Sequence, residues 1–263
     1  MTTASTRTVS LRPDLQLALS EAGSGRPIMI LHGGGGPFTV AGLTAQLAVA
    51  AHTIVPTHPG WNGTERSEWF SGIDDLALAY LHYLEDADLR DVLVIGSSLG
   101  GWIGSEMVLR DGAGLITGLI LLDAVGVQVE GESIRDFFAL DARGIAEYAW
   151  HDAERAYIAS ANVSPEQAAR QRANLETMRV MAGHPYMHDP KLLRRLGRSD
   201  VPTLLIWGES DRIVTPAYGA AYAAAFRNAR FETVKEAGHL PQLEQPAATF
   251  ALIDEYLQAG RPV

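Results

Sequence analysis

The sequence predicts an α/β fold in which a parallel sheet is covered by helices on both faces and is interrupted by a helical insertion. Short apolar runs alternate with helix-like segments through the first 126 residues, the alternation stops, and it returns near residue 199. Continuous apolar runs are typical of strands buried on both faces of a sheet. We therefore expect one α/β core formed by residues 1–126 and 199–263, with a helical cap formed by residues 127–198.

The first part of the core contains the expected elements in alternation. Strands are predicted over residues 15–19, 28–31, 53–55, 92–95 and 119–122. Helices are predicted over residues 40–50, 73–84 and 102–109. In the segment that starts at Ile73, apolar residues recur at the spacing of one helix face through Leu84. This order indicates strands joined by helical crossovers, as a parallel sheet requires.

The insertion differs from the core because it is charged and rich in alanine and aromatic residues, with no clear strand. Ser164-Pro165-Glu166 is a helix-start signal, so we expect a helix to follow it. The core then resumes with a strand over 203–207, a helix over 218–226, a strand over 231–234 and a last helix from Pro246 through Leu257.

The composition narrows the class of partner. The chain has 263 residues, a formal net charge of −10 and no cysteine, which excludes disulfides, thiolate metal sites and a cysteine nucleophile. An excess of acidic residues disfavours binding to nucleic acid or to anionic membranes. No apolar run has the length of a signal peptide or a membrane span. We expect a cytoplasmic monomer or homodimer that acts on a small molecule and needs neither a metal nor an organic cofactor.

Residues 96–100 carry the clearest chemical motif. Gly96-Ser97-Ser98-Leu99-Gly100 matches the G-x-S-x-G nucleophile elbow, follows a predicted buried strand and opens a predicted helix. Glycines at these positions allow a sharp turn that presents a serine in a strained conformation. The alternative is a simple tight turn, and Ser97 stands one position too early for the motif. We therefore take Ser98 as the candidate nucleophile.

A serine nucleophile needs a base and a carboxylate that orients the base. Of the eight histidines, only His239 follows the last predicted strand. Asp211 lies just beyond the strand over 203–207, and Asp123 ends the strand over 119–122, so both satisfy the order Ser, Asp, His. We favour Asp211 because it lies in the strand–turn unit directly before the histidine, and Asp123 stays the alternative acid.

An acyl-transfer site also needs backbone N–H groups for the oxyanion. The N–H of Leu99, directly after the candidate nucleophile, is one expected donor. The loop His32–Pro37, which reads HGGGGP, supplies the other, because successive glycines let backbone amides converge. Phosphate binding by this loop is disfavoured because no Gly-Lys-Ser/Thr follows and no G-x-G-x-x-G pattern fits. His32 itself is expected to brace the loop.

With these motifs the chain resembles the α/β-hydrolase superfamily, through LHGGGG, THPGWNG, GSSLGG, WGESDRIVTP and AGHLPQLEQP in the family's order. The resemblance implies an eight-stranded, mostly parallel sheet with a helical cap after the sixth strand. It implies Ser98 as nucleophile, Asp211 as acid and His239 as base, with the N–H groups of Gly34 and Leu99 in the oxyanion hole. The most similar group is the lidded esterases, lactonases and C–C bond hydrolases of aromatic ring-cleavage products.

We therefore expect hydrolysis of a small, largely apolar ester or lactone through an acyl-enzyme on Ser98, with Gly33, Trp150, Tyr186 and Leu240 in contact with substrate. The alternative is C–C bond hydrolysis of ring-cleavage products by the same triad. In that group a tryptophan commonly stands at the position of Leu240. A ligand-binding receptor with slow turnover, a perhydrolase and a lyase are further alternatives. C–C hydrolysis needs a cation for the substrate carboxylate, for which the insertion offers arginines such as Arg135, Arg143, Arg155 and Arg179.

Overall fold

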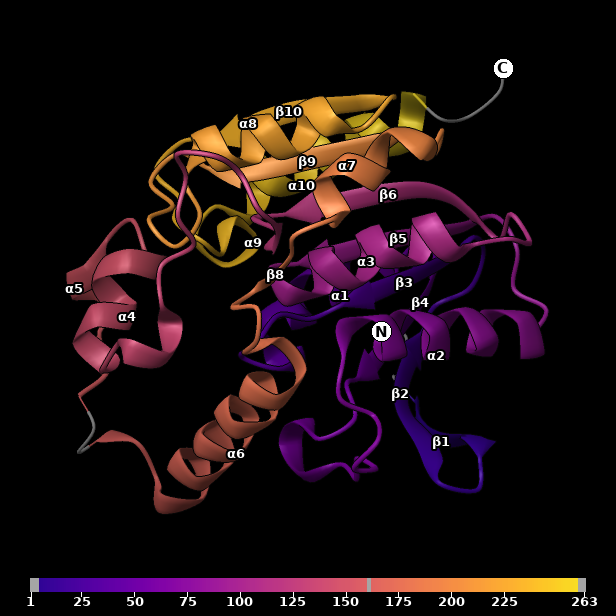
Figure 1. Cartoon of the computed structure of the whole chain (residues 1–263), viewed down its shortest axis with the longest axis horizontal. Coiled ribbons are helices and arrows are strands. Elements are labelled where there is room, and N and C mark those ends of the chain that lie inside the picture. The colour runs from indigo at the N-terminus through magenta and orange to yellow at the C-terminus, as the bar shows by residue number, and fades with distance from the viewer. Residues whose placement is uncertain (1–4, 160–161, 260–263) are drawn as a thin grey trace.

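An eight-stranded sheet forms the centre of the computed structural model, which describes residues 5–159 and 162–259 (Figure 1). The strand order is β1-β2-β4-β3-β5-β6-β9-β10. The strands are β1 (Ser5–Arg12), β2 (Leu15–Ala22), β3 (Pro27–Leu31), β4 (His52–Thr57), β5 (Val92–Ser97), β6 (Ile116–Leu122), β9 (Thr203–Gly208) and β10 (Ala229–Val234). The pairs β1–β2 and β2–β4 are antiparallel, and the other pairs are parallel. The predicted mostly parallel eight-stranded sheet is confirmed.

Helices cover both faces of this sheet, as the sequence predicts. One apolar core lies under α2, α3, α7 and α8, which are in front of the sheet in Figure 1, and a second lies under α1 and α10. The α-helices are α1 (Ala41–Leu47), α2 (Ile73–Asp86), α3 (Leu99–Arg110), α4 (Ala142–Ala149), α5 (Ala153–Ala156), α6 (Pro165–Ala182), α7 (Leu192–Arg195), α8 (Pro216–Ala225), α9 (Pro241–Glu244) and α10 (Pro246–Ala259). The short 3-10 helices are η1 (Pro37–Val40), η2 (Trp61–Gly63), η3 (Phe137–Ala139) and η5 (Leu196–Arg198).

The central strands fix where the functional loops meet. Strand β5, with the sequence VLVIGS, is buried along its whole length between β3 and β6. Because parallel strands bring their carboxyl ends to the same edge, the loops after β3, β5, β6 and β9 lie together there. These loops contain Gly33, Ser98, Asp123 and Asp211. The order of strands therefore assembles residues that are far apart in the chain.

Two parts of the sheet structure were not predicted. Strand β1 was missed because it lies at the exposed edge of the sheet and buries none of its residues fully. The expectation of no strand in the insertion is wrong, since β8 (His188–Asp189) pairs with β7 (Gly126–Val127). These two strands are two residues long, which is too short to produce a periodic signal. They are held by Tyr218, whose hydroxyl hydrogen-bonds to the N–H and C=O of Val127.

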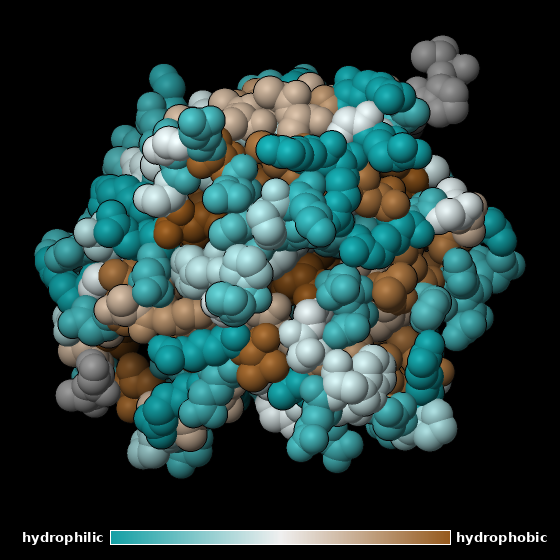
Figure 2. Space-filling model, in the orientation of Figure 1, coloured by the Kyte–Doolittle hydropathy of each residue, from teal (hydrophilic) through white to brown (hydrophobic). Residues whose placement is uncertain are grey.

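Helices α4 and α5 lie side by side on the left of Figure 1, and α6 lies apart from them, lower in the view, where it contacts η2. Figure 2, in the same orientation, shows a mainly hydrophilic face on which apolar residues are visible between hydrophilic ones. At the end of the insertion, α7 contacts α8 and η5 contacts α3, so residues 192–198 pack on the core. Within residues 5–159 and 162–259, no helix combines the length and the apolar character that a membrane span requires.

Candidate active site

Ser98 lies at a strained turn between β5 and α3. Its backbone has φ 52° and ψ −113°, a conformation that is rare for a residue with a side chain and that is held by a 2.8 Å hydrogen bond from its N–H to the Leu122 carbonyl. The turn also depends on glycines. A Cβ atom at Gly100 would lie 2.1 Å from the Leu31 carbonyl oxygen, and one at Gly96 would lie 2.3 Å from the carbonyl oxygen of Gly100. The G-x-S-x-G pattern therefore serves close backbone packing as well as the turn.

His239 connects Ser98 to Asp211. Its Nε2 lies 2.9 Å from Ser98 Oγ, and its Nδ1 lies 2.8 Å from Asp211 Oδ2. An ionised carboxylate only accepts hydrogen bonds, so Nδ1 carries the proton and Nε2 is free to accept one from the serine. Asp211 Oδ1 in turn accepts the backbone N–H groups of Ile213 and Val214 at 2.8 and 3.2 Å. The three side chains form a continuous hydrogen-bonded relay in which the histidine can act as a general base.

Asp123, the alternative acid, lies beside this relay. It is fully buried, its Oδ1 accepts the N–H of Gly208 at 2.9 Å, and its Oδ2 has no hydrogen-bond partner among the described residues. Burial and the neighbouring carboxylate of Asp211 raise the pKa of Asp123 well above its usual range. The structure thus gives the hydrogen bond to His239 to Asp211 and leaves Asp123 as a second buried acid next to it.

These three groups are also the candidate metal ligands in the described part of the chain, since Asp123, Asp211 and His239 each offer a ligand atom within 4.8 Å of the others. Both nitrogens of His239 and both oxygens of Asp211 are already hydrogen-bonded. Only an oxygen of Asp123 is left, whereas a zinc site uses at least three protein ligands. The donor set therefore does not fit a zinc ion.

The loop after β3 reaches the nucleophile. A Cβ atom at Gly33 would lie 3.1 Å from the Ser98 Cβ atom, so the glycine backbone packs directly against that side chain. Gly34 follows under α6, where its own Cβ would lie 2.3 Å from Met178 Sδ. Leu99 begins α3, and the first N–H groups of a helix have no partner within the helix and favour negative charge. The N–H groups of Gly34 and Leu99 are thus the candidate oxyanion donors.

The segment THPGWNG, residues 57–63, supports this loop in a way that sequence reasoning missed. Trp61 Nε1 donates a 2.9 Å hydrogen bond to the Gly34 carbonyl, and His58 Nε2 donates one of 2.9 Å to the His32 carbonyl. The available signal was positional, because both loops follow neighbouring parallel strands, β3 and β4, and each carries a histidine.

Helix α4 of the insertion is hydrogen-bonded to the loops that contain Asp211 and His239. The N–H of His239 donates to the Ala149 carbonyl at 2.8 Å, and the N–H of Arg212 donates to the Tyr148 carbonyl at 3.2 Å. Trp150 follows directly, and its Cα would lie 2.8 Å from a Cβ atom at Gly238. The end of α4 therefore places Trp150, a predicted substrate contact, beside the histidine loop.

Helix α6 is attached to the other side of the site through side chains. The N–H of Asn62 donates to Asn174 Oδ1 at 2.8 Å, and Asn174 Nδ2 donates to Asn62 Oδ1 at 3.1 Å. Thr177 Oγ1 adds a 3.0 Å hydrogen bond to the Gly60 carbonyl. Together with Met178 above Gly34, these contacts hold the helix over the site.

The other two predicted substrate contacts differ in their surroundings. Leu240 is half-buried and comes directly after His239, where it precedes α9. The hydroxyl of Tyr186 accepts from the Phe137 N–H and donates to the Arg135 carbonyl, both at 2.7 Å. The Tyr186 hydroxyl therefore holds parts of the insertion together. Of these two residues, Leu240 is the one that lies next to His239.

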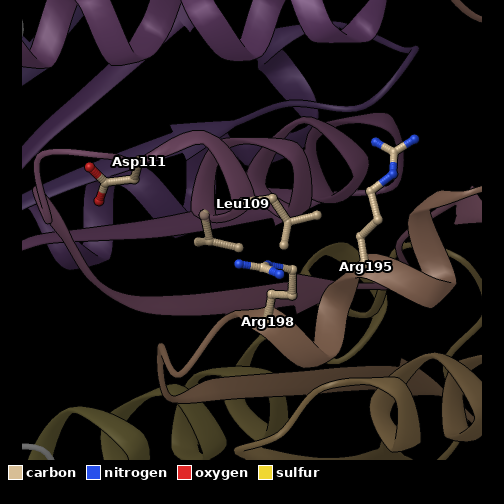
Figure 3. Close-up of a pocket in the computed structure, with 5 residues that line it drawn as sticks. Leu109, Asp111, Arg195 and Arg198 are labelled. Carbon is tan, nitrogen blue, oxygen red and sulfur yellow. The ribbon is translucent and has the colours of Figure 1, made fainter.

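A separate surface hollow lies between the end of α3 and the α7–η5 segment (Figure 3). Its volume is about 300 Å³, and its lining residues are Val108, Leu109, Asp111, Arg195 and Arg198. None of the predicted site residues lines it, so we assign the hollow no part in the chemistry of Ser98.

The fold and the site define an α/β protein with a Ser–His–Asp hydrogen-bond relay at the carboxyl edge of its sheet. Residues 28–252 match the model of the alpha/beta hydrolase family, and the chain belongs to this family. A hydrolase of Pseudomonas putida named for 2-hydroxy-6-oxononadienedioate and 2-hydroxy-6-oxononatrienedioate is 21% identical over 256 residues, which cover 90% of each chain.

Two solved structures share the fold over nearly the whole chain. An N-acyl homoserine lactonase, AidH, has a TM-score of 0.78 at 20% identity and is covered over 98% of its chain by 99% of this one. A thermophilic esterase of Thermogutta terrifontis has a TM-score of 0.71 at 18% identity, with 98% of each chain covered. At these identities the similarity shows a common fold. It does not show which bond this protein cleaves, which depends on the chemistry of the site.

Proposed function

We propose that this protein is a serine hydrolase that cleaves a small, largely apolar carboxylic ester or lactone. The observation that carries the proposal is the relay from Ser98 Oγ through His239 to Asp211, with hydrogen bonds of 2.9 and 2.8 Å. A strained serine, a histidine in the required tautomer and a buried carboxylate are the parts that acyl transfer requires.

In the proposed mechanism, Ser98 Oγ attacks the substrate carbonyl while His239 Nε2 takes its proton. Asp211 stabilises the imidazolium cation that forms. The N–H groups of Gly34 and Leu99 stabilise the oxyanion, and each such donor is worth about 3 kcal/mol of the barrier. His239 then gives its proton to the leaving alcohol, which leaves an acyl group on Ser98. A water molecule, deprotonated by His239, releases the acid and restores the serine.

The surroundings of the site favour an apolar acyl group. The thioether of Met178 lies over Gly34, and Leu240 stands directly after the histidine. Such soft, apolar side chains suit an acyl chain that carries no charge. The lactonase and the esterase among the structural neighbours are consistent with this substrate class.

The test is a series of 4-nitrophenyl esters of increasing acyl length, with a set of simple lactones, assayed on wild type, Ser98→Ala and Ser97→Ala. We expect multiple turnovers by wild type and a loss of about 10⁴-fold or more in kcat for Ser98→Ala. Ser97 is the matched control because it is the neighbouring serine and lies outside the relay. An inert wild type, or a Ser98→Ala variant that keeps its activity, rejects the proposal. Binding without multiple turnovers identifies a receptor instead.

C–C bond hydrolysis is the second candidate, and the Pseudomonas putida relative favours it. It needs a cation for the substrate carboxylate. Arg143 is bonded to two glutamates, Arg135 stacks 4.2 Å from the Tyr148 ring, and Arg179 stacks 4.8 Å from the Phe138 ring. Because three of the four arginines named as candidates, all but Arg155, are already engaged, the ester or lactone is preferred. The test is an absorbance assay on a ring-cleavage dienoate. Turnover of the dienoate, seen as a loss of its absorbance, would make C–C bond hydrolysis the preferred function.

A further inference from the structure

The peptide unit between Gly33 and Gly34 has a hydrogen-bonded carbonyl and, in the proposed function, a catalytic N–H. The carbonyl belongs to Gly33, and the N–H is the candidate oxyanion donor of Gly34. A peptide unit is planar and rigid, so the direction of its C=O fixes the direction of its N–H. With glycine on both sides, the unit rotates at little steric cost unless other groups hold it.

Two donors hold this carbonyl. His32 Nδ1 lies 2.7 Å from Gly33 O, and the N–H of Gly36 lies 3.1 Å from the same atom. The following peptide is held as well, by the 2.9 Å bond from Trp61 Nε1 to the Gly34 carbonyl. The peptide planes on both sides of Gly34 are thus fixed by hydrogen bonds from residues outside the sheet.

The side chain of His32 is in turn held by His58. The backbone N–H of His58 donates to His32 Nε2 at 3.1 Å, which leaves Nδ1 of His32 as the protonated nitrogen that donates to Gly33 O. His58 Nε2 donates to the His32 carbonyl at 2.9 Å, and the two rings lie 3.7 Å apart. Each ring therefore has only one tautomer that satisfies its partners.

Tyr80, on α2, holds the ring of His58. Its hydroxyl lies 2.5 Å from His58 Nδ1 and donates to it, because the other ring nitrogen of His58 must carry the proton for the His32 carbonyl. Tyr80, His58 and His32 are all fully buried. Burial lowers the pKa of His32 to about 4 and that of His58 well below its usual range, which keeps both rings neutral.

We propose that Tyr80, His58 and His32 are positioning residues that aim the Gly34 N–H at the substrate carbonyl, through two linked sets of hydrogen bonds. The backbone N–H of His58 orients the His32 ring, whose Nδ1 holds Gly33 O. The His58 ring, held by Tyr80, fixes the His32 carbonyl one peptide earlier. The inference rests on the proposed function, since it needs an oxyanion at Ser98. None of the three side chains is assigned a contact with substrate. The role is to keep the His32–Gly33 and Gly33–Gly34 peptide planes in one orientation, which lowers the reorganisation needed in the transition state.

The first test is Tyr80→Phe, which removes the hydroxyl oxygen that donates to His58 Nδ1. Without the hydroxyl donor, His58 is free to move its proton to Nδ1, and the bond to the His32 carbonyl is lost. Removal of a whole oxyanion donor costs about 10²- to 10³-fold in kcat, so we expect about a tenfold fall for a misaimed one, with KM unchanged. We expect a larger fall of about 100-fold for His58→Phe. His58→Gln recovers part of it, because its amide can donate to the same carbonyl.

Tyr83→Phe is the matched control. Tyr83 lies on the same helix, is 2% exposed and also loses a bonded hydroxyl, which contacts Glu21 and Arg7 at 3.0 Å and not the active site. An alkyl trifluoromethyl ketone, whose adduct with serine is an oxyanion, separates positioning from a general loss of structure. Its inhibition constant should rise about tenfold in Tyr80→Phe and stay unchanged in Tyr83→Phe.

A readout without catalysis keeps the two proposals distinguishable. In a ¹H–¹⁵N spectrum, the amide signal of Gly34 should move in Tyr80→Phe and stay in place in Tyr83→Phe, whether or not a substrate is known. If wild type cleaves no ester while the Gly34 signal moves, the proposed function fails, although the three side chains still fix the orientation of the Gly33–Gly34 peptide. If Ser98→Ala abolishes activity while Tyr80→Phe keeps wild-type kcat, inhibition and Gly34 shift, the positioning role is wrong. If Tyr80→Phe does not fold, the same measurements are made on His58→Gln.

Discussion

Replacement of Asp211 by asparagine tests the assignment of the acid, because the amide cannot satisfy both sides of the aspartate. Asp211 Oδ1 accepts two backbone N–H groups, while Oδ2 accepts the proton of His239 Nδ1. An asparagine that turns its NH₂ toward the two N–H groups leaves them unpaired, at about 1–3 kcal/mol each. The amide therefore keeps its oxygen there and presents its NH₂ to His239, which forces the proton onto Nε2, where it cannot accept one from serine.

We expect Asp211→Asn to lower kcat by about 10⁴-fold, or about 5 kcal/mol of barrier, with an unfolding free energy close to that of wild type. The measurement is steady-state turnover of a 4-nitrophenyl ester together with urea unfolding.

Asp123→Asn is the matched control for this variant. An asparagine there still accepts the Gly208 N–H and can donate to Asp211, so we expect kcat within a few-fold of wild type. A loss in Asp123→Asn as large as that in Asp211→Asn would show that the acid is misassigned.

The remaining predictions concern the loop after β3, the buried ring of His32 and the attachment of the insertion. Gly33→Ala places a Cβ atom 3.1 Å from that of Ser98 and should lower kcat about 100-fold, whereas Gly42→Ala, with no atom within 4 Å of its Cβ, should leave kcat unchanged. The pKa of His32 is about 4 in the fold and about 6.5 when unfolded, so the unfolded chain binds the extra proton between these values. Stability should therefore fall by about 3 kcal/mol as pH drops from 6.5 to 4, and an unchanged urea midpoint at pH 7 and pH 5 would contradict this. Asn174→Ala breaks two hydrogen bonds to η2 and should cost about 2 kcal/mol of unfolding free energy, a value that a loss under about 0.5 kcal/mol would refute.

Much of the fold could be predicted because each strand of a parallel sheet has a recognisable local sequence pattern. Buried strands such as β5 are continuous apolar runs, and each ends at a polar or glycine residue at the same edge. This is why Ser98, Asp211 and His239 could be named from strand ends, and why the structure places them within hydrogen-bond distance of one another. The edge strand β1 and the two-residue pair β7–β8 carry no comparable burial pattern.

What could not be predicted depends on contacts between side chains far apart in sequence. The bond between His58 and His32 spans 26 residues, and that between Tyr80 and His58 depends on how α2 packs on the sheet. The choice of Asp211 over Asp123, in contrast, followed from the position of Asp211 in the strand–turn unit before the histidine, and the structure gives the hydrogen bond to His239 to Asp211.

The two ways in which the insertion is attached have different consequences for the evolution of specificity. Helix α4 is bound through its own carbonyls at Tyr148 and Ala149, which accept the N–H groups of Arg212 and His239. Backbone bonds of this kind tolerate any side chain but no shift of the helix, so α4 can change sequence only while its path is kept. Helix α6 is bound by Asn174, Thr177 and Met178, and substitution of these side chains would let the whole helix move. Under the proposed function, new substrate shapes would therefore be admitted by displacement of α6, with His239 left undisturbed.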